Sequence, residues 1–397
     1  MKILMLAPHA FYIDRGTPID VDILVRALSE LGHEVDLLVY HQGEDRSYPG
    51  LRIFRTKGSE KLGEIGPGFS GKKLKCDKQM YVDAVALAKA NRYDVVHAGE
   101  EAVFMAMRLK KKFGLPYVYD MDSSIAQQMV EKFGFLKPVA WGFNAMERRA
   151  VRGAMAVSPV CHALADLARK HGAVHVETLH DISQLKPSDL EHGDALRMRL
   201  KIEGAMLLYV GNLERYQGVD LLLESMVHVH AAACGARLVI AGGSDEHIGQ
   251  YEKKAAALGI GEAVHFIGRV PVSGLGGLLS QADVLVAPRT MGVNTPQKIF
   301  PYMHTGKPVV VTDLPTHTQL LDDEVVALGE AEPRGFAKAI IDLVNDPAKQ
   351  KQLGEAGRRF VEENHTYPAH LERVRQLYDY VAGRLSVETV AGQASIG

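Results

Sequence analysis

The sequence has little cysteine, no long apolar run and no recognisable export signal. Its three cysteines, Cys76, Cys161 and Cys234, lie far apart without the spacing of a metal site, which argues against a disulfide framework and fits a reducing compartment. No run of about 18 apolar residues exists, the length that a membrane-spanning helix needs. The first residues, MKILMLAP, predict a strand followed by a loop and lack a cleavable signal pattern. We therefore expect a cytosolic globular protein.

A large excess of charge of one sign is also missing. The 397 residues carry 46 basic and 48 acidic side chains, a net charge of −2, so nothing global points to nucleic acid or to a bulk membrane surface. A hydrophobic share of 47% with 24% charged residues is ordinary for a well-packed soluble protein. At typical domain sizes this length predicts about two to three domains.

Apolar runs and helical repeats alternate through the first half of the chain. A strand at residues 2–7 is followed by a predicted helix in which Thr17 is the cap, Pro18 takes the first helical position and Gly32 ends the helix. The next strand, Val35 to Val39, completes a βαβ unit. The motif G-x-G-x-x-G is absent, so no dinucleotide site is indicated. The continuing alternation predicts a parallel sheet with helices on both faces.

The alternation weakens after residue 179 and restarts at residue 206. Residues 183–204 are polar and contain Pro187 and Gly193, and we interpret them as a linker. It would join an N-terminal domain over residues 1–182 to a C-terminal domain over residues 205–367. An amphipathic helix at residues 368–386 is expected to pack back on the N-terminal domain, followed by a frayed tail. The predicted fold class is α/β, with two doubly wound Rossmann-like domains facing each other across a cleft.

One stretch, residues 284–313, combines turn-forming residues with cations. A buried strand leads into a loop, and a helix is predicted to start at Thr295 and Pro296 and to end at Gly306. Free amides and the positive end of the helix dipole would then point to the sheet edge, which makes an anion site suited to phosphate. Arg289 and Lys298 flank this site with positive charge. The alternative is an ordinary strand-loop-helix turn.

Two further groups follow strands of the first half. Gly16, Thr17 and Pro18 repeat the loop-to-helix pattern, which predicts a second anion site. Asp122 lies past the carboxyl end of a strand, where open α/β sheets bind their ligands, so we predict that it lies beside a substrate hydroxyl. The alternative is that the aspartates and serines of YDMDSS, residues 119–124, cap a helix that begins near Ser124.

Motifs spread over nearly the whole chain carry a family resemblance. The strongest are GNLERYQGVDLLLES at residues 211–225, FIGRVP at 266–271, ADVLVAPR at 282–289 and NTPQKIFPYMHTGKPVVVTDLPTHTQLL at 294–321. RGTPIDV near the start and YDMDSSIAQQM at 119–129 add to them. Together these motifs resemble family 4 of the retaining glycosyltransferases, which have the GT-B fold. The resemblance implies a nucleotide-sugar donor held mainly by the C-terminal domain, an acceptor that approaches from the N-terminal domain, and transfer with retention.

In such a transfer a diphosphate leaves with growing negative charge. Fixed cations and helix-start amides stabilise that charge without a metal, so we expect no metal and no other cofactor. The resemblance and the two anion sites predict a set of donor-binding residues, which are Gly16, Thr17, Asn212, Arg215, Gln217, Arg269, Asn294 and Thr295. The predicted catalytic residues are Asp122, Arg289 and Lys298.

The sequence departs from the family pattern in the predicted diphosphate site. Asn212 and Gln217 stand where the family has an arginine and a lysine. Because a charge-assisted contact is about twice as strong as a neutral one, some cation is needed there. The available replacements are Arg215, Arg289 and Lys298.

Three other positions also depart from the family pattern. Pro301 and Val293 stand where the family has two glutamates, and neither can accept a hydrogen bond from ribose. Pro301 is also expected to kink the predicted helix, because proline lacks the amide hydrogen. Asp122 stands where many members have a histidine. An aspartate can still accept a hydroxyl proton or bind a sugar hydroxyl, although it is a weaker proton carrier at neutral pH.

Two segments carry clustered basic residues. Residues 49–79 are rich in glycine and lysine and are predicted to form a mobile surface loop, with contact to an acceptor or a phospholipid as the alternative. Residues 131–152 mix aromatic and basic side chains, among them Trp141 and Arg148. We expect the apolar residues to face a core. The alternative is docking on an anionic membrane.

The function predicted is that of a glycosyltransferase acting on a glycan, lipid-linked or small-molecule acceptor. A catalytically degenerate nucleotide-sugar-binding relative and a sugar-nucleotide epimerase on the same fold are the alternatives. No nucleic-acid partner is expected. The predicted location is cytoplasmic, with peripheral contact at the inner membrane face as an open alternative.

Overall fold

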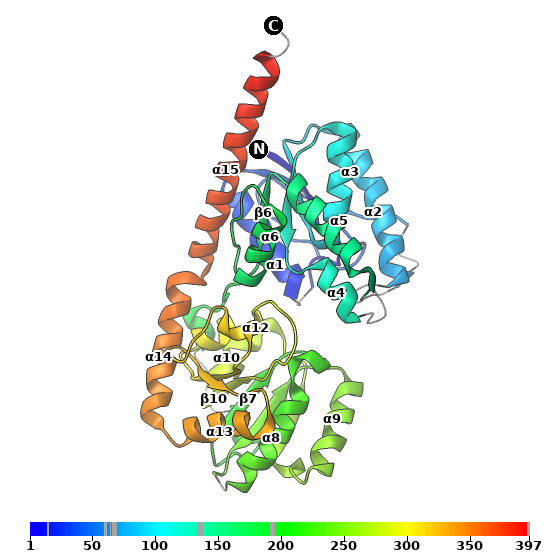
Figure 1. Ribbon diagram of the computed structural model, residues 1–397. Helices are drawn as coiled ribbons and strands as arrows, with labels where there is room; N and C mark the ends of the chain where they lie inside the picture. The colour runs from blue at the N-terminus through cyan, green and yellow to red at the C-terminus, as the bar shows by residue number, and fades with distance from the viewer. Residues whose placement is uncertain are drawn as a thin grey trace. The chain divides into compact units, whose positions relative to one another are not determined.

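The computed structural model describes residues 1–13, 16–58, 62–63, 65, 70–132, 138–190, 195–232 and 234–394 (Figure 1). The chain divides into two compact units, each with its own sheet. The first unit comprises Met1–His180 and His370–Gly397, and the second comprises Asp181–Ala369.

The first unit contains a six-stranded parallel sheet in the order β3-β2-β1-β4-β5-β6. Its strands are β1 (Lys2–Leu6), β2 (Glu34–Val39), β3 (Leu51–Arg55), β4 (Val95–Gly99), β5 (Tyr117–Met121) and β6 (Ala156–Pro159). Central strands such as β1 are buried almost throughout, because helices cover both faces of a parallel sheet. The strand order reverses between β1 and β4, which is where open α/β sheets bind their ligands.

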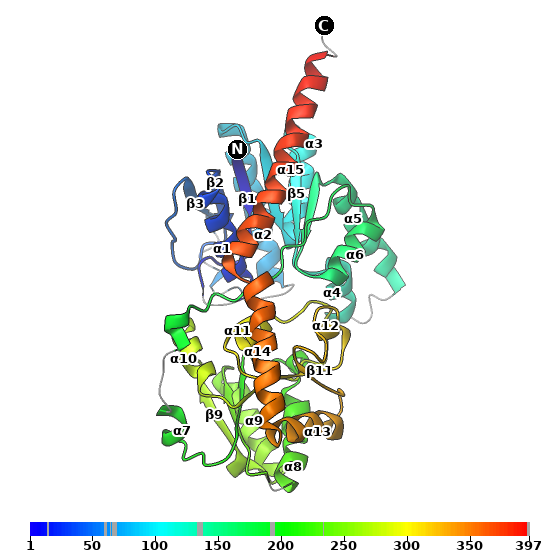
Figure 2. The ribbon, with the colours of Figure 1, turned by 90° about the vertical axis from the view of Figure 1, so that its left-hand side faces the viewer.

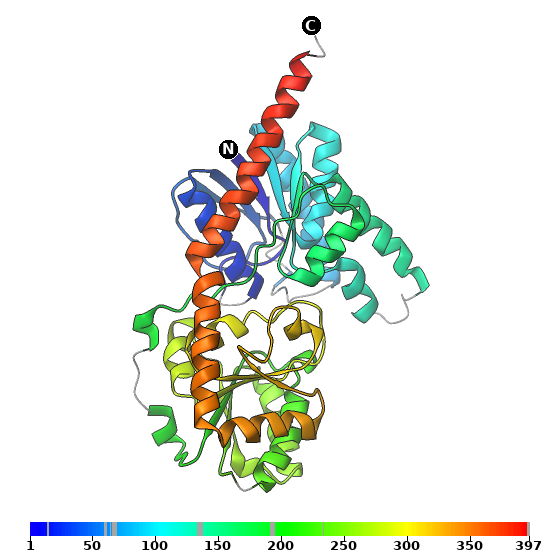
Figure 3. The same ribbon diagram turned by 60° about the vertical axis from the view of Figure 1, so that its left-hand side comes forward.

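Helices lie on both faces of this first sheet. They are α1 (Gly16–Glu30), α2 (Gly71–Ala90), α3 (Val103–Phe113), α4 (Ile125–Lys132), α5 (Ala140–Gly153), α6 (His162–His171) and α15 (Tyr367–Ala394), with a short 3-10 turn η2 (Glu100–Ala102). Helices α1 and α15 share one core with the sheet, to which α15 contributes Val374, Leu377, Tyr378 and Val381. Figures 2 and 3 show α15 running along this unit. Helices α2, α3 and α5 are neighbours in the layer on the opposite face.

The structure corrects two predictions in this unit. The loop predicted over residues 49–79 contains strand β3, and α2 begins at Gly71, where the Ser70 side chain accepts a hydrogen bond from the Lys73 amide. Residues 59–61, 64 and 66–69 of that loop lie outside the described part. Strand β3 was missed because Arg52 breaks its apolar pattern; Arg52 pairs with the buried Asp36 at 2.6 Å. The tail predicted to fray continues α15 to Ala394.

The second unit repeats the architecture with the order β12-β11-β10-β7-β8-β9, again all parallel. The strands are β7 (Met206–Val210), β8 (Arg237–Ala241), β9 (Val264–Gly268), β10 (Val284–Ala287), β11 (Val309–Thr312) and β12 (Ala327–Gly329). The α-helices are α7 (Ala195–Arg199), α8 (Val219–Ala231), α9 (Asp245–Ala257), α10 (Leu275–Ser280), α11 (Ile299–His304), α12 (Pro315–Thr318), α13 (Pro333–Val344) and α14 (Pro347–Asn364). The 3-10 turns are η4 (Pro187–Leu190), η5 (Arg215–Gln217), η6 (Gly261–Ala263) and η7 (Val272–Gly274). The prediction of two doubly wound parallel units is confirmed.

The segment predicted as a linker belongs largely to the second unit. Leu196 and Ile202 are buried in one of its two cores, beside Met206 and Leu285. Arg197 forms an ion pair with Asp283, whose carboxylate also accepts the Met206 amide at 2.7 Å. Residues 191–194 lie outside the described part.

Candidate functional site

Three loops converge at the carboxyl edge of the second sheet, beside the point where the strand order reverses between β7 and β10. They follow β7, β8 and β10, and glycines let them approach closely. A Cβ on Gly211 would collide with Lys298 Nζ, one on Gly218 with the Pro288 carbonyl, and one on Gly242 with the Gly211 carbonyl. Gly218 and Gly242 also have the positive φ that favours glycine. The glycines thus let the three loops pack against one another, and Gly211 brings the backbone close to Lys298.

Lys298 is the cation at the centre of these loops. Its ammonium donates a hydrogen bond to Tyr209 Oη at 2.9 Å and lies 4.0 Å from the centre of the same ring. Among the described residues, no carboxylate lies within ion-pair distance of it. Although part of the side chain reaches solvent, burial and the neighbouring Arg289 hold the pKa of Lys298 well below the usual value of a lysine. A bound anion would relieve both effects.

Arg289 lies on the loop after β10 and is oriented by neutral groups. Its Nε donates to the Met291 carbonyl at 2.8 Å, and Nη2 donates to Asn294 Oδ1 at 3.0 Å. The guanidinium also lies 5.3 Å from the centre of the Tyr216 ring. These contacts hold a planar, always charged group at the sheet edge, a geometry that suits phosphate oxygens.

The short helix α12, which was not predicted as a helix, holds this loop in place. On or beside α12, the Thr316 hydroxyl donates to the Asn294 carbonyl at 2.8 Å and Gln319 donates to the Val293 carbonyl at 2.7 Å. The Thr312 hydroxyl, at the end of β11, donates to the Arg289 carbonyl at 2.5 Å. Polar side chains at the end of a buried strand or directly after it were the sequence signal that could have identified Thr312, Thr316 and Gln319.

The helix predicted to start at Thr295 and Pro296 begins later. Helix α11 starts at Ile299 and has six residues, and the Thr295 hydroxyl is buried without a hydrogen-bond partner, so Thr295 is not its cap. Pro301 is therefore the third residue of α11 and lies in its first turn, not in the interior of a longer helix as predicted. Gly306, with φ of 74°, ends this segment as predicted.

The other predicted residues of this unit lie on the surrounding loops. Asn212 is exposed, and its Oδ1 accepts the Glu214 amide at 3.2 Å. Arg215 is exposed on η5, whereas Gln217 is buried. Arg269 follows β9 and donates to the Gly243 carbonyl at 3.2 Å. The structure thus brings Arg289, Lys298 and Asn294 together, whereas Arg215 is exposed on η5.

The remaining predicted residues lie in the first unit. Gly16 and Thr17 form the first turn of α1, which starts one residue before the predicted cap. Asp122 directly follows β5. The capping alternative for its neighbours is confirmed for Ser124, whose hydroxyl oxygen accepts the Gln127 amide at 3.2 Å.

A buried carboxylate holds the segment that follows β5. Glu147 of α5 accepts hydrogen bonds from the Ser124 hydroxyl at 2.9 Å and the Ala126 amide at 3.3 Å. Its other oxygen lies 3.1 Å from His171 Nε2. Glu147 and His171 are both nearly inaccessible to solvent, so this network fixes the start of α4 at Ile125, three residues after Asp122.

Acidic groups gather at the carboxyl edge of the first sheet. Glu100 follows β4 with a φ of 46°, unusual for a residue other than glycine, and together with Glu101 it faces the ammonium of Lys73. Burial, reinforced by Glu101, raises the pKa of Glu100 to about 7. Asp120, on β5, lies 3.4 Å from His97 Nε2. A group that titrates near neutral pH at such an edge can exchange protons with a bound hydroxyl.

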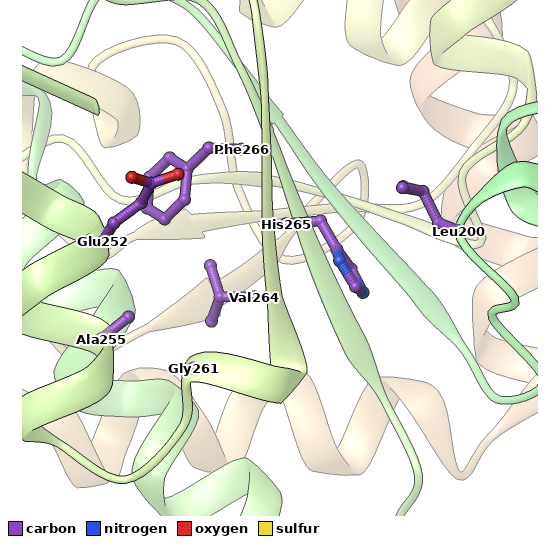
Figure 4. Close-up of a pocket in the computed structure, with 7 residues that line it drawn as sticks. All are labelled: Leu200, Glu252, Ala255, Gly261, Val264, His265 and Phe266. Atoms are coloured by element: carbon purple, nitrogen blue, oxygen red, sulfur yellow. The ribbon is translucent and has the colours of Figure 1, made fainter. Parts of the chain in front are cut away.

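The second unit also has a surface hollow that is separate from the predicted site residues. It follows the edge strand β9, with Glu252, Ala255, Val264 and Phe266 on one side of the strand and Leu200 and His265 on the other (Figure 4). None of the predicted site residues lines it. The described residues also contain no group of three or more His, Cys, Asp or Glu side chains placed to hold a metal ion.

Two family models match the chain, one over each sheet. A model described as "Glycosyl transferase 4-like domain" matches residues 16–180, and one described as "Glycosyl transferases group 1" matches residues 204–346. Among curated proteins, the phosphatidyl-myo-inositol mannosyltransferase of Mycobacterium leprae (strain TN) is 29% identical over 166 residues, 40% of this chain and 43% of that protein. The chain spans about half the length of the curated relatives it matches.

Solved structures share the fold over almost the whole chain. Sucrose-phosphate synthase from Thermosynechococcus elongatus aligns with a TM-score of 0.77 at 20% identity, covering 96% of this chain and 99% of that one. HepE from Anabaena in complex with UDP and glucose aligns with a TM-score of 0.73 at 15% identity and the same coverage. With both sheets matched by family models, the chain belongs to the group 1, family 4 glycosyltransferases, and it has their GT-B fold.

Proposed function

We propose that this glycosyltransferase binds the diphosphate of its donor through Arg289 and Lys298 and transfers the sugar, with retention and without a metal. The observation that carries the proposal is the pairing of two cations at the sheet edge, of which Lys298 has no carboxylate within ion-pair distance among the described residues. A half-buried ammonium without a counter-ion is unfavourable. A diphosphate supplies the missing charge.

The reaction breaks the bond between the anomeric carbon and the diphosphate oxygen, and the electron pair leaves with the diphosphate. The acceptor hydroxyl forms the new bond to the anomeric carbon and loses its proton. Arg289 and Lys298 stabilise the charge that grows on the leaving group, since preorganised cations act most strongly where charge develops. Asp122 is the proposed partner of the acceptor hydroxyl, as hydrogen-bond acceptor or proton acceptor.

The other proposed donor contacts surround these cations. Arg215 and Arg269 add positive charge on the loops after β7 and β9, and Asn294 positions Arg289. Asn212, Gln217 and Thr295 complete the set in the second unit, which is the proposed donor domain. The Thr295 hydroxyl is buried without a hydrogen-bond partner and can donate a hydrogen bond to the donor substrate. Gly16 and Thr17 are the proposed contacts from the first unit, the acceptor-side domain.

The sugar, the base and the acceptor are open to experiment. One relative is named for mannosyl transfer to phosphatidyl-myo-inositol, and one structural neighbour was solved with UDP and glucose. The proposed acceptor is a glycan, a lipid-linked sugar or a small molecule. The decisive experiment is calorimetric binding of UDP, GDP and ADP, followed by nucleotide release from the matching sugars. Binding of one diphosphate, weakened by Lys298→Ala, is expected; failure of all three to bind would refute the proposal.

The departures at Asn212, Gln217 and Pro301 favour a second candidate, a relative that binds a nucleotide sugar without transferring it. Its signature would be tight nucleotide binding with no transfer to any acceptor. An epimerase on the same fold would instead convert a donor sugar with no acceptor present. Product analysis by mass spectrometry and NMR separates these outcomes from transfer.

A further inference from the structure

The first unit has one strongly basic face. Helix α2 exposes Lys72, Lys75, Lys78 and Lys89, and the last turn of α3 exposes residues 110–112, all lysines. These helices are neighbours in the layer over one face of the sheet (Figure 1). These helices therefore gather positive charge on one face of the first unit, although the net charge of the chain is −2.

Helix α5 extends this face with Arg148, Arg149 and Arg152, all exposed. The three helices contain few acids in their described residues, and none of these is exposed: Asp77 bonds Tyr40, Asp83 bonds Gln79, and Glu147 is buried. On the opposite face of the sheet, α1 carries more acidic than basic residues. We define the exposed residues of α2, α3 and α5 as the basic face.

Large apolar side chains are exposed on the same helices. Trp141 is 75% exposed and Met146 52% exposed on α5, and Leu74 is 57% and Val82 52% exposed on α2. The prediction that the aromatic residues of 131–152 face a core is therefore wrong for Trp141; residues 133–137 lie outside the described part. Exposed apolar groups among cations mark an interaction surface rather than a core.

We propose that the basic face of α2, α3 and α5 binds the surface of an anionic lipid membrane. Lysine and arginine side chains can bury their aliphatic stems and keep their charges at the headgroups, while Trp141, Met146, Leu74 and Val82 enter the interface. Such binding needs no spanning helix, and the described residues contain no helix long and apolar enough to cross a membrane. The proposal is independent of sugar transfer.

The combination of residues favours lipid over nucleic acid. Surfaces that bind single strands pair cations with aromatic residues on which bases stack, whereas three of the four exposed apolar residues here are aliphatic. Tryptophan and aliphatic residues amid cations are typical of helices that lie in a membrane interface.

Trp141 makes the test direct, because it is the only tryptophan of the chain. The full-length protein is mixed with phosphatidylcholine vesicles, with and without phosphatidylglycerol, and followed by tryptophan emission and co-sedimentation. A blue shift and sedimentation with the anionic vesicles alone are expected, both weakened by added salt. Absence of binding, or equal binding to neutral vesicles, would overturn the proposal.

Two double variants distinguish binding through the basic face from binding through the overall charge of the protein. Arg148→Glu with Arg149→Glu should lower the vesicle partition coefficient by about tenfold or more, since each basic residue near an anionic surface contributes about 1 kcal/mol. The control, Lys349→Glu with Lys351→Glu, makes the same charge change at exposed positions of α14. An equal loss in the control would refute the assignment. So would tighter binding to a single-stranded oligonucleotide, or self-association that the Arg148 and Arg149 variant abolishes.

Discussion

The ammonium of Lys298 lies 2.9 Å from the Tyr209 hydroxyl and over the ring of the same residue. Tyr209 in turn donates from that hydroxyl to the Asn212 carbonyl at 2.6 Å. One tyrosine therefore links Lys298 to the loop after β7, where the family pattern has cations and this chain has Asn212. The loop after β7 lacks the positive charge of the family pattern. Lys298, from the segment after β10, supplies a positive charge beside it.

Arg289→Ala should weaken binding of the nucleoside diphosphate by about 1.5–3 kcal/mol, the range of hydrogen bonds to charged groups. Arg289→Lys should recover only part of the loss, because lysine lacks the planar fork that contacts Met291 and Asn294 together. Isothermal titration calorimetry measures both. Arg334→Ala, an exposed arginine on α13, is the control and should leave affinity unchanged. Wild-type affinity in Arg289→Ala would remove Arg289 from the site.

Lys298→Met should change how stability depends on pH. Burial lowers the pKa of Lys298 in the folded protein, so the unfolded chain binds more protons and the wild type gains stability as pH rises from the lowered pKa towards the usual lysine value of 10.5. The variant lacks this gain. Urea unfolding without nucleotide should therefore give the wild type a lower free energy of unfolding than Lys298→Met at low pH. This difference should shrink as pH rises. A constant difference between the two proteins would contradict a lowered pKa of Lys298 in the folded state.

Thr316→Val should loosen the loop that carries Arg289. The substitution removes the hydroxyl bonded to the Asn294 carbonyl and keeps the shape of the side chain. We expect a loss of about 1 kcal/mol in the free energy of unfolding and weaker nucleotide binding. Thr318→Val is the matched control, because Thr318 is exposed on the same short helix. If both variants bind nucleotide equally, the loop does not depend on Thr316.

Pro301→Ala should change the free energy of unfolding by no more than about 1 kcal/mol. Pro301 lies in the first turn of α11, where a proline disturbs the helical hydrogen bonds less than it does in a helix interior. A proline in a helix interior would cost about 3 kcal/mol, and replacing it would stabilise the protein by a similar amount. Chemical denaturation distinguishes the two cases, and a large stabilisation would place Pro301 in a helix interior.

Glu147→Ala should destabilise the first unit by about 3 kcal/mol, because it leaves the Ser124 hydroxyl, the Ala126 amide and His171 buried without their acceptor. The same variant should slow transfer if Asp122 acts on the acceptor, since it frees the start of α4. Urea unfolding and transfer assays measure the two effects. Glu30→Ala, exposed on α1, is the control. A stability loss no larger than the control's would show that the network contributes little.

The sequence by itself determined the alternation of strands and helices, and hence two parallel sheets, because the short apolar runs of buried strands and the 3.6-residue repeat of helices are local properties of the chain. It also identified the cations of the candidate site: Arg289 and Lys298 follow a buried strand, and strand ends lead to the sheet edge where ligands bind. The same local reading located Gly306 at the end of a helix, because glycine adopts the left-handed conformation needed there.

The tertiary structure decided the features in which packing overrides or completes the local preference of the chain. Thr295 and Pro296 have the residue types of a helix start, yet α11 begins at Ile299, after the loop that Thr316 and Gln319 hold from α12. Residues distant in sequence set that boundary, so no local pattern could. Likewise, the pattern around Trp141 fits a core and a surface equally well. Only the packing of α5, with Glu147 and Val151 turned inward, leaves Trp141 exposed on the helix that also carries exposed arginines.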